Sequence, residues 1–480
     1  MSAPLPSPAV APRGARVPDT LIIVGALALL AWAATFLFTP GRFAVAGEPA
    51  RLVPGSFAAA AGPAPAPLLG AGDAVGLLDL MFEGLVSGTR AGATIGLMAF
   101  LLCVGGAFGV IARTGAIDRL LARAVTGGRA GRGLLLLLFA LFSLAGAVFG
   151  LSEEAIPLTL ILAPALARAG HRPALAVALC YGASQIGFAT SWMSPFTVLI
   201  AQAIAGLPPL SGLELRAAMW VGFTGAGLAW LALWLRANPP APAAAAAAGA
   251  GAPGGAGWVD RLILLLVGLC VAWVAWGVSA KGWFLAEISA QFLALGLVVA
   301  ALAAWTGRIA GGLSGAAAAF RDGAAQMVPA ILVVGLAKGI VLLLGGDDPA
   351  RDSLMNALLS GAAGFTALLP EWLTAWGMLA VQSAINFLIT SGSGQAAVTM
   401  PLMAPLADLS GVTRQTAVLA YQLGAGLTDL IAPTSASLMG CLAAARVEFG
   451  QWLRFVWKPI AALYALASAF VIGAHALGYS

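Results

Sequence analysis

Apolar residues along this chain gather into long runs instead of alternating with polar ones. Runs of about 17 to 28 mostly apolar residues recur, and at about 1.5 Å per residue each can cross roughly 30 Å of hydrocarbon as a helix. Strands of a membrane barrel would alternate apolar and polar residues, and these runs do not. The pattern predicts an all-α polytopic membrane protein.

The hydropathy pattern predicts about nine transmembrane helices and two apolar but interrupted stretches. The stretch 134–167 breaks at "GLSEEAIP", and the stretch 373–407 breaks at "TSGSGQAA". We interpret both as re-entrant hairpins, which enter the membrane halfway and return. The nine predicted spans are Leu21 to Phe38, Ala93 to Ile111, Ala174 to Ala203, Ala217 to Leu235, Leu262 to Val278, Ile288 to Trp305, Ala324 to Leu344, Thr416 to Ala443, and Leu453 to His475.

Composition and charge agree with a membrane location. Of the 480 residues, 61% are hydrophobic and only 9% are charged. This hydrophobic content is far higher than the core of a soluble protein needs. The net charge of +5 comes from cations scattered at helix ends, without a basic aromatic patch, so nucleic acid is not expected as a partner. With nine crossings, most of these cations fall on one side of the membrane, and positive residues near span ends tend to stay in the cytoplasm. This asymmetry predicts a bacterial inner-membrane protein with a cytoplasmic N-terminus and an extracytoplasmic C-terminus.

The two halves of the chain resemble each other at a constant offset. Ser152, Ala155 and Ala163-Pro164 match Ser393, Ala396 and Ala404-Pro405, all 241 positions later. With nine crossings, the two hairpins enter from opposite sides, so the repeat is inverted. Inverted repeats with broken segments in matching positions are typical of secondary transporters. The predicted domains are 1–74 (tail, first span and loop), 75–237 (first repeat, cytoplasmic-side hairpin), 238–257 (flexible linker), 258–308 (two connecting spans) and 309–480 (second repeat, outside hairpin).

Two long spans carry Gly, Pro, Ser and Thr where a lipid-facing helix would carry Leu and Val. These segments are "GASQIGFATSWMSPFT", from Gly182 to Thr197, and "GAGLTDLIAPTS", from Gly424 to Ser435. Unwinding there would free carbonyls for a cation and amides for an anion, which hydrocarbon tolerates only where the backbone lines an enclosed cavity. Both segments are therefore expected at the binding site.

Ionisable residues at membrane depth are the strongest site candidates, because burial without a partner is costly. An internal ion pair between Lys338 and a glutamate is the structural alternative. Polar residues near the breaks and the hairpin tips, including Ser184, Gln185 and Thr190, complete the lining. The predicted substrate-binding residues are Ser152, Glu153, Glu154, Ser191, Ser194, Lys338, Asn386, Ser391, Ser393, Gln395, Thr428, Asp429, Thr434 and Ser435.

The adjacent glutamates need a shared proton or cation, because like charges side by side destabilise each other. The candidate coupling ion is Na⁺ or H⁺, and no other cofactor is expected. The residues predicted near a sodium ion are Ser152, Glu154, Thr190, Ser393 and Asp429.

Other function classes fit the sequence less well. HExxH is absent, and a nucleophilic serine with a spanning histidine cannot be assembled, so an enzyme is not expected. A passive channel would not need opposed hairpins that exchange sides.

Four motifs together resemble the YfcC family of DcuC-like carriers, within the ion transporter superfamily. These are "GLSEEAIPLTLILAPALARAG", "NFLITSGSGQAAVTMPLMAPLADLSGVTRQTAVLAYQLGAGLTDLIAPTS", "GWFLAEI" and "FGVIARTGAID". The resemblance implies two inverted repeats with opposed hairpins, a homodimer, and elevator-like movement of a transport domain. Family members often carry Asp-Gly and Asn where this chain has Ala425-Gly426 and Asp429, so family ion ligands do not carry over simply.

Family members are described either as C4-dicarboxylate carriers or as basic amino acid antiporters. Lys338 and the hairpin N-termini favour a carboxylate, whereas Glu153, Glu154 and Asp429 favour a cationic group. An amino acid satisfies both sets, so it is preferred over a C4-dicarboxylate as the small-molecule substrate.

Overall fold

Helices make up nearly all of the fold. The computed structural model describes residues 19–46, 51–53, 55–70, 74–88, 95–116, 128–194, 197–208, 210–240, 257–283, 285–346 and 348–479, so most of the linker predicted at 238–257 lies outside the described residues. The helices of the first half are α1 (Thr20–Leu37), α2 (Leu80–Val86), α3 (Ile95–Arg113), α5 (Gly128–Phe149), α6 (Ala155–Arg168), α7 (Ala174–Val177), the π-helix η1 (Ala178–Gly182), α8 (Ala183–Ala189), α9 (Val198–Ile204) and α10 (Leu213–Ala237). The helices of the second half are α12 (Trp258–Lys281), α13 (Leu285–Trp305), α14 (Gly312–Ala325), α15 (Val328–Leu343), α16 (Leu354–Ala367), α17 (Glu371–Asn386), α18 (Gly392–Leu409), α19 (Arg414–Thr428), α20 (Ala436–Ala445) and α21 (Phe449–Ala476).

Seven helical segments in the described part of the chain are long and apolar enough to cross a membrane. Six of them contain predicted spans, namely α1, α3, α10, α13, α21 and the segment Gly312–Leu343, in which the predicted span corresponds to α15 and not to α14. The seventh, Gly131–Val148, lies in α5, which the sequence pattern assigned to a hairpin arm. The predicted spans at 174–203 and 416–443 are each divided into shorter helices. The prediction of an all-α polytopic membrane protein is therefore confirmed.

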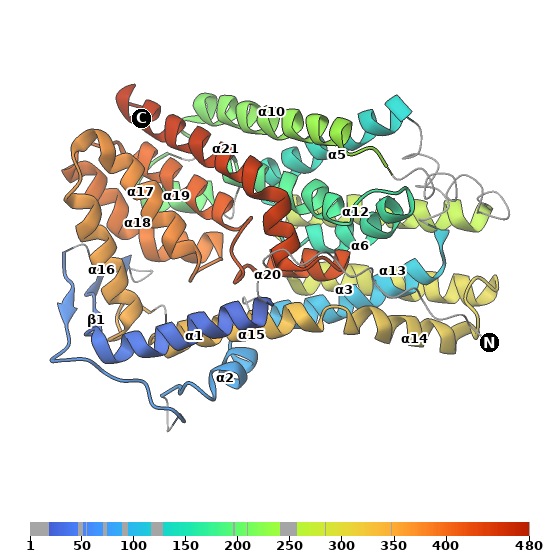
Figure 1. The fold of residues 1–480 in the computed structure, drawn as a ribbon, viewed down its shortest axis with the longest axis horizontal. Coiled ribbons are helices and arrows are strands. Elements are labelled where there is room, and N and C mark those ends of the chain that lie inside the picture. Colours follow the sequence, from blue (N-terminus) through green and yellow to red (C-terminus); the bar gives the residue numbers. More distant parts are fainter. Residues whose placement is uncertain are drawn as a thin grey trace.

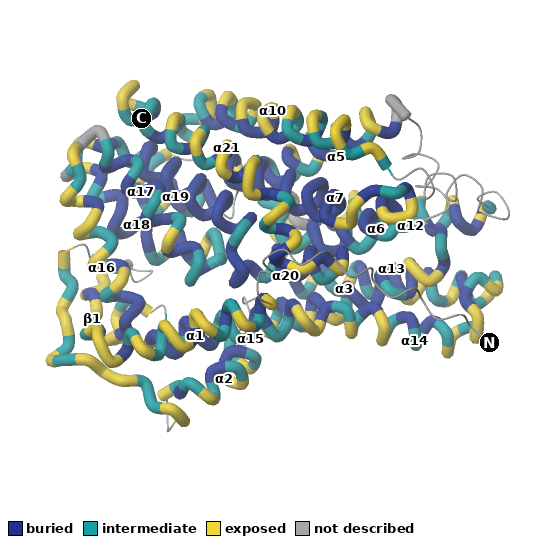
Figure 2. The backbone as a smooth tube through the Cα atoms, viewed as in Figure 1, coloured by how far each residue is buried: buried dark blue, intermediate teal, exposed yellow. Residues whose placement is uncertain are grey.

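The helices surround a buried centre. In Figure 1, α10 runs along the top of the view and α21 descends from the top to the centre, whereas α1, α15 and α14 run along the lower part, above α2. Between them lie α7, α19 and α20, whose backbones are mostly buried, while the outer helices carry most of the exposed positions (Figure 2). The broken spans thus lie inside the protein, where irregular backbone can be satisfied by protein groups.

The two interrupted apolar stretches form helix pairs. The first pair, α5 and α6, is joined by a tip at residues 150–154, where Gly150 has φ +71°. The second pair, α17 and α18, is joined by a tip at residues 387–391, and Ser391 caps α18 by accepting from the Gly394 N–H at 3.2 Å. We call these segments the first tip and the second tip. Both fall where the sequence pattern predicted an interruption.

Elements of the second half follow those of the first at the same offset. α6 ends at Arg168 and α18 at Leu409, and α9 ends at Ile204 and α20 at Ala445, so each pair of ends lies 241 positions apart. The pairs α5 with α17 and α10 with α21 also begin and end within five residues of this offset. The packing matches as well, because α5 contacts α8 just as α17 contacts α19.

Close helix packing depends on glycine. A Cβ at Gly187 of α8 would overlap the main-chain oxygen of Ser143 on α5, and a Cβ at Gly146 would overlap the main-chain oxygen of Ser184. Small residues allow membrane helices to approach at backbone distance. These two glycines therefore hold α8 against the first arm of the first helix pair.

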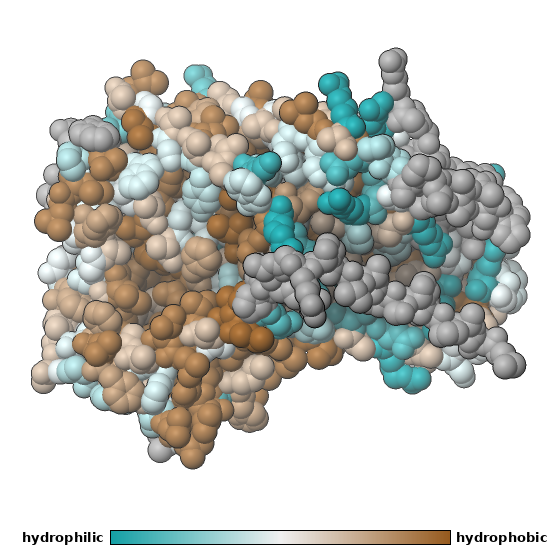
Figure 3. All heavy atoms as spheres, in the orientation of Figure 1, coloured by the Kyte–Doolittle hydropathy of each residue, from teal (hydrophilic) through white to brown (hydrophobic). Residues whose placement is uncertain are grey.

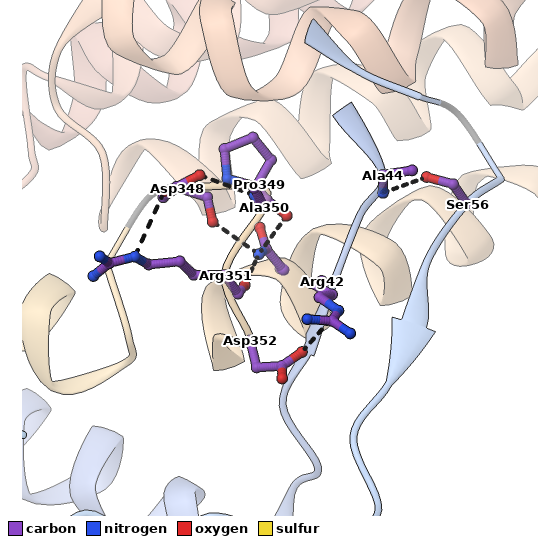
Figure 4. Close-up of polar contacts among 9 residues, drawn as sticks. Arg42, Ala44, Ser56, Asp348, Pro349, Ala350, Arg351 and Asp352 are labelled. Atoms are coloured by element: carbon purple, nitrogen blue, oxygen red, sulfur yellow. Dashed lines mark hydrogen bonds and ion pairs between the residues drawn. The ribbon is translucent and has the colours of Figure 1, made fainter. Parts of the chain in front are cut away.

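Two small antiparallel ladders form a strap over one end of the helices. β1 (Gly41–Arg42) pairs with β4 (Ala58–Ala59), and β2 (Val45–Ala46) pairs with β3 (Arg51–Leu52). The strap is fastened to the loop before α16, because the Gly41 N–H donates to the Ser353 carbonyl at 3.2 Å and Arg42 lies 3.9 Å from the Asp352 carboxylate (Figure 4). Asn356 orders this loop by donating to the Arg351 carbonyl at 2.8 Å.

Candidate functional site

Two helices at the centre of the molecule are interrupted at equivalent places. The first break runs from Thr190 to Thr197, between α8 and α9, and its residues 195 and 196 lie outside the described residues. The second break, residues 429–435, separates α19 from α20. Both breaks fall within the Gly- and Pro-bearing segments selected from the sequence. A helix end leaves carbonyls without intrahelical partners, so each break presents polar backbone to its surroundings.

The first tip joins the two halves of the chain. The Ser152 hydroxyl donates to Ser437 Oγ on α20 at 3.0 Å and accepts from Gln185 Nε2 on α8 at 3.1 Å. Glu153 lies close to the same Ser437 hydroxyl, and Glu154 Oε2 accepts from the Ser152 N–H at 3.1 Å. Both glutamates thus lie at the tip, as the sequence predicted, and Glu153 faces the second half.

The second tip is held by a network of buried side-chain amides. Gln395 donates to both the main-chain and the side-chain oxygen of Gln382 at 2.8 Å, and it accepts from Asn386 Nδ2 at 3.1 Å. Gln382 in turn donates to Thr399 Oγ1 at 3.0 Å. Gln395 therefore joins the arms of this helix pair, while Asn386 keeps its side-chain oxygen without a hydrogen-bond partner.

The second half contributes a buried carboxylate to this region. Asp429 opens the second break, is 4% exposed, and has one carboxylate oxygen without a hydrogen-bond partner. Its carboxylate lies within reach of Asn386 and interacts electrostatically with Glu153. Gln185, which contacts the first tip, likewise has a buried side-chain oxygen without a partner. Buried acceptors without donors are costly, so this group is suited to a cation or a proton.

Each break is closed by a residue of the other half. The Tyr181 hydroxyl donates to the Asp429 carbonyl at 3.1 Å and lies 3.1 Å from Ser435 Oγ. The Gln422 amide donates to the Phe188 carbonyl at 3.2 Å. Tyr181 and Gln422 were not among the predicted site residues, because a single polar residue in an apolar helix does not indicate its distant partner.

A fully buried arginine supports this arrangement. Arg216, near the start of α10, is 0% exposed and donates to the side-chain oxygen of Gln422 and, at 3.4 Å, to that of Gln415. Its guanidinium also interacts with Tyr479 near the end of the chain. The charge thus lies among oxygen acceptors, which is what makes a buried arginine tolerable. It was not among the predicted site residues.

Several predicted residues have hydroxyls engaged with the backbone. Ser191 donates to the Ala147 carbonyl at 2.5 Å and accepts from the Ser194 N–H at 2.8 Å. Thr434 donates to the Phe387 carbonyl in the second tip at 2.7 Å. These residues shape the breaks and tips through local hydrogen bonds.

Four further predicted residues differ in their surroundings. Thr190 donates to the Ile186 carbonyl at 2.7 Å, and Ser393 is exposed at the start of α18. Thr428 lies 2.5 Å from the Tyr464 hydroxyl on α21. Lys338 is half-buried on α15, which packs against α20, the helix that carries Ser437.

The described residues contain no group of three or more His, Cys, Asp or Glu side chains that could hold a metal ion. Any cation would therefore depend on neutral oxygens together with the Glu153 and Asp429 carboxylates. Oxygen ligands of this kind suit hard cations.

Comparison with known proteins identifies the family. A family model described as DcuC, C4-dicarboxylate anaerobic carrier, matches residues 17–476. Over 96% of its length the chain is 39% identical to the Escherichia coli (strain K12) protein named "Putative basic amino acid antiporter YfcC", of which 97% is covered. It is also 28% identical, over 81% of its length, to an uncharacterized protein of Haemophilus influenzae, of which 77% is covered.

Two solved structures are similar at low identity. The YdaH transporter of Alcanivorax borkumensis matches with a TM-score of 0.45 and 17% identity, covering 96% of this chain and 99% of that one. MtrF of Neisseria gonorrhoeae matches with a TM-score of 0.44 and 16% identity, covering 96% and 95% of the two chains.

The resemblance noted in the sequence motifs is thereby confirmed, and so is the prediction of a transporter in place of an enzyme. The match extends over nearly the whole chain, including both tips and both breaks. This chain is a multi-pass membrane transporter that belongs to the DcuC family of C4-dicarboxylate anaerobic carriers.

Proposed function

We propose that this protein is a secondary active transporter that moves a small amino acid or carboxylate across the bacterial inner membrane, coupled to an ion or to exchange. The observation that supports it best is the buried Asp429 carboxylate of the second half, which has an oxygen without a donor and interacts electrostatically with Glu153 of the first half. A buried carboxylate without a donor, under the influence of a second carboxylate, favours a proton or a cation. In ion-coupled transport the ion and the substrate bind together, so carboxylates that need a proton or a cation fit such a mechanism.

Internal symmetry supports alternating access. The donors Tyr181 and Gln422 are 241 positions apart, and so are the carbonyls of Phe188 and Asp429 that they reach in the other half. Such reciprocal contacts are expected of two repeats related by a twofold axis. We infer that the repeats are inverted, with re-entrant tips on opposite sides, a cytoplasmic N-terminus and an extracytoplasmic C-terminus. Elevator-like movement within a homodimer follows from the family resemblance.

The coupling ion is Na⁺ or H⁺. The best candidate ligands for this ion are side-chain oxygens of Asp429, Asn386 and Gln185, because each is buried without a hydrogen-bond partner. Of the residues predicted near sodium, Ser152 and Asp429 lie in this region, whereas Ser393 is exposed. Sodium would be held by Asp429 and neutral oxygens, and a proton would be shared between Asp429 and Glu153.

The substrate class follows from the charge of the site. Glu153, Glu154 and Asp429 give it an acidic character that suits the amino group of a substrate, and the N-terminus of α18 suits a carboxylate. An amino acid, including a basic one, provides both groups. The matching family model is described as a C4-dicarboxylate anaerobic carrier, whereas the Escherichia coli relative is named "Putative basic amino acid antiporter YfcC", so a C4-dicarboxylate is the second candidate.

Thermal unfolding of the purified protein tests the proposal. A ligand that binds only the native state raises the apparent Tm, by an amount that grows with its concentration relative to Kd. Arginine, lysine, ornithine, succinate and fumarate are compared with and without sodium at two pH values. A basic amino acid that raises Tm in wild type but not in Glu153→Gln supports the proposal. A dicarboxylate shift that excess arginine, ornithine or lysine leaves unchanged would overturn the amino acid assignment.

A further inference from the structure

An apolar groove lies on the outside of the helices. It has a volume of about 180 Å³ and lies between α5, η1, α8, α10 and α21. The exposed residues Ala226 and Ala462 line its mouth, and Gly182 of the π-helix and Leu430 of the second break line its floor. The groove thus opens to the membrane-facing surface and ends against the interrupted helices.

Basic side chains lie at and beside the mouth of this groove. Lys458 is the only charged residue among the described residues that line it, and Arg454 is exposed one turn earlier on the same helix. The last turn of α10 contributes Arg236. The rings of Trp230 and Trp234 lie edge-on to the Phe455 ring, with 5.4 and 5.2 Å between ring centres. Hydrophilic residues gather on the corresponding side of the molecule, the right half of the view in Figure 3.

The position of Lys458 along α21 agrees with the level of lipid headgroups. Lys458 and His475 are 17 positions apart, which corresponds to about 26 Å of helix and nearly spans a hydrocarbon layer of roughly 30 Å. Lys458 also lies 5.5 Å from the centre of the Trp457 ring, and tryptophan with lysine is a common pair at the membrane interface. The lining residues Ile460, Ala462 and Leu463 lie deeper, at acyl-chain level.

We propose that this groove is a binding site for an anionic phospholipid. One acyl chain occupies the space between α10 and α21, and the phosphate pairs with Lys458 and Arg454 at the rim. A cavity of about 150 Å³ can hold a benzene molecule, so about 180 Å³ accommodates a segment of acyl chain. The hydrophilic substrate of a carrier would find few polar partners there.

A lipid bound in the groove would affect the second break and the bend in α21. Trp452, a lining residue, donates from its indole N–H to the Leu430 carbonyl in the second break at 2.8 Å. Pro459 interrupts the hydrogen bonds of α21 beside the same space and allows this helix to bend there. A bound chain packs against both, and so stabilises one arrangement of the break.

The test measures lipid retention and thermal stability of the intact, delipidated protein. Phosphatidylglycerol and phosphatidylcholine with identical chains are added back, and bound lipid is counted by native mass spectrometry. We expect wild type to retain phosphatidylglycerol preferentially and to gain Tm. Lys458→Gln should weaken retention about fivefold, the effect of one basic residue near an anionic surface. Ala462→Trp should abolish it by filling the groove, whereas Ala461→Trp, at an exposed neighbour outside the lining, should leave it unchanged.

Each other outcome overturns the proposal. Equal retention by Ala462→Trp and Ala461→Trp would place the lipid elsewhere. Equal retention of the two headgroups would remove the role of Lys458 and Arg454. Full competition by glycerol 3-phosphate, which has no acyl chain, would reduce the site to a phosphate contact at the rim. Because Lys458 and both alanines are exposed, their substitution should not prevent folding.

Discussion

The side-chain amide of Gln422 donates to the main-chain oxygen of Ser191 at 2.7 Å, so a residue of the second half closes the break in the first half. The side-chain oxygen of Gln422 accepts from Arg216. This single glutamine therefore satisfies both a buried cation and freed backbone carbonyls. Its substitution should have effects that its size alone does not explain.

Gln422→Leu is expected to lower the free energy of unfolding by about 2 to 3 kcal/mol, because it leaves the carbonyls of Phe188 and Ser191 and part of the Arg216 charge without partners. Arg216→Met should also destabilise. The double variant should lose less than the sum, with a coupling of about 0.5 to 3 kcal/mol. Unfolding in mixed micelles of increasing SDS content measures all three. Strict additivity would show that the two side chains do not interact.

Tyr181→Phe is expected to reduce transport while preserving the fold. It keeps the buried ring and removes only the hydroxyl that reaches the Asp429 carbonyl and Ser435. The expected loss of stability is about 1 kcal/mol, with a larger effect on substrate affinity because the second break loses its support. Uptake into proteoliposomes gives KM and maximal rate. The control is Trp32→Phe, which removes an indole donor from the Ala66 carbonyl, far from the breaks; equal losses in both variants would contradict a specific role.

Glu153→Gln is expected to abolish or uncouple transport without loss of stability. The change removes one of two carboxylates that interact across the halves, so the apo protein should unfold at the same or a higher temperature. Glu448→Gln, at an exposed carboxylate before α21, is the matched control and should transport normally. Normal, ion-coupled transport by the Glu153→Gln, Glu154→Gln double variant would refute the assigned role.

Gly41→Ala is expected to weaken the strap far more than Arg42→Ala does. A Cβ at Gly41 would clash with the Phe57 ring and lie 2.7 Å from the Ala58 carbonyl oxygen. The Arg42–Asp352 ion pair is exposed, with side chains 63% and 46% accessible, so its loss should cost less than about 1 kcal/mol. Limited proteolysis of the strap in the two variants compares them. Equal protection in both would show that Phe57 moves aside freely.

The sequence predicts the fold well where hydropathy and helix length agree. α10 extends from Leu213 to Ala237 around the predicted Ala217 to Leu235, and the Gly- and Pro-rich segments mark both breaks. It misses α16, whose 14 residues are too short to span a membrane. It also misses α14, because Arg321 and Asp322 lower the local hydropathy.

The residues of the site can be predicted only in part from the sequence. Ionisable residues in apolar surroundings identify Glu153 and Asp429, but nothing local indicates that they approach each other. Tyr181 and Gln422 occupy matching places in the two halves, yet they differ in chemistry, so a search for identical residues passes over them. Arg216 stands before a predicted span and resembles an ordinary helix-end cation until folding surrounds it.

The burial of Arg216 has a consequence for the order of events during synthesis. Its partner Gln422 lies 206 residues later in the chain. At about 5 to 20 residues per second, α10 emerges roughly 10 to 40 s before the ribosome completes that glutamine. During this interval the guanidinium, on the fourth residue of its helix, can reach the headgroup region. The first half therefore enters the bilayer before its buried cation has a partner, and α19 provides that partner only when the second half is made.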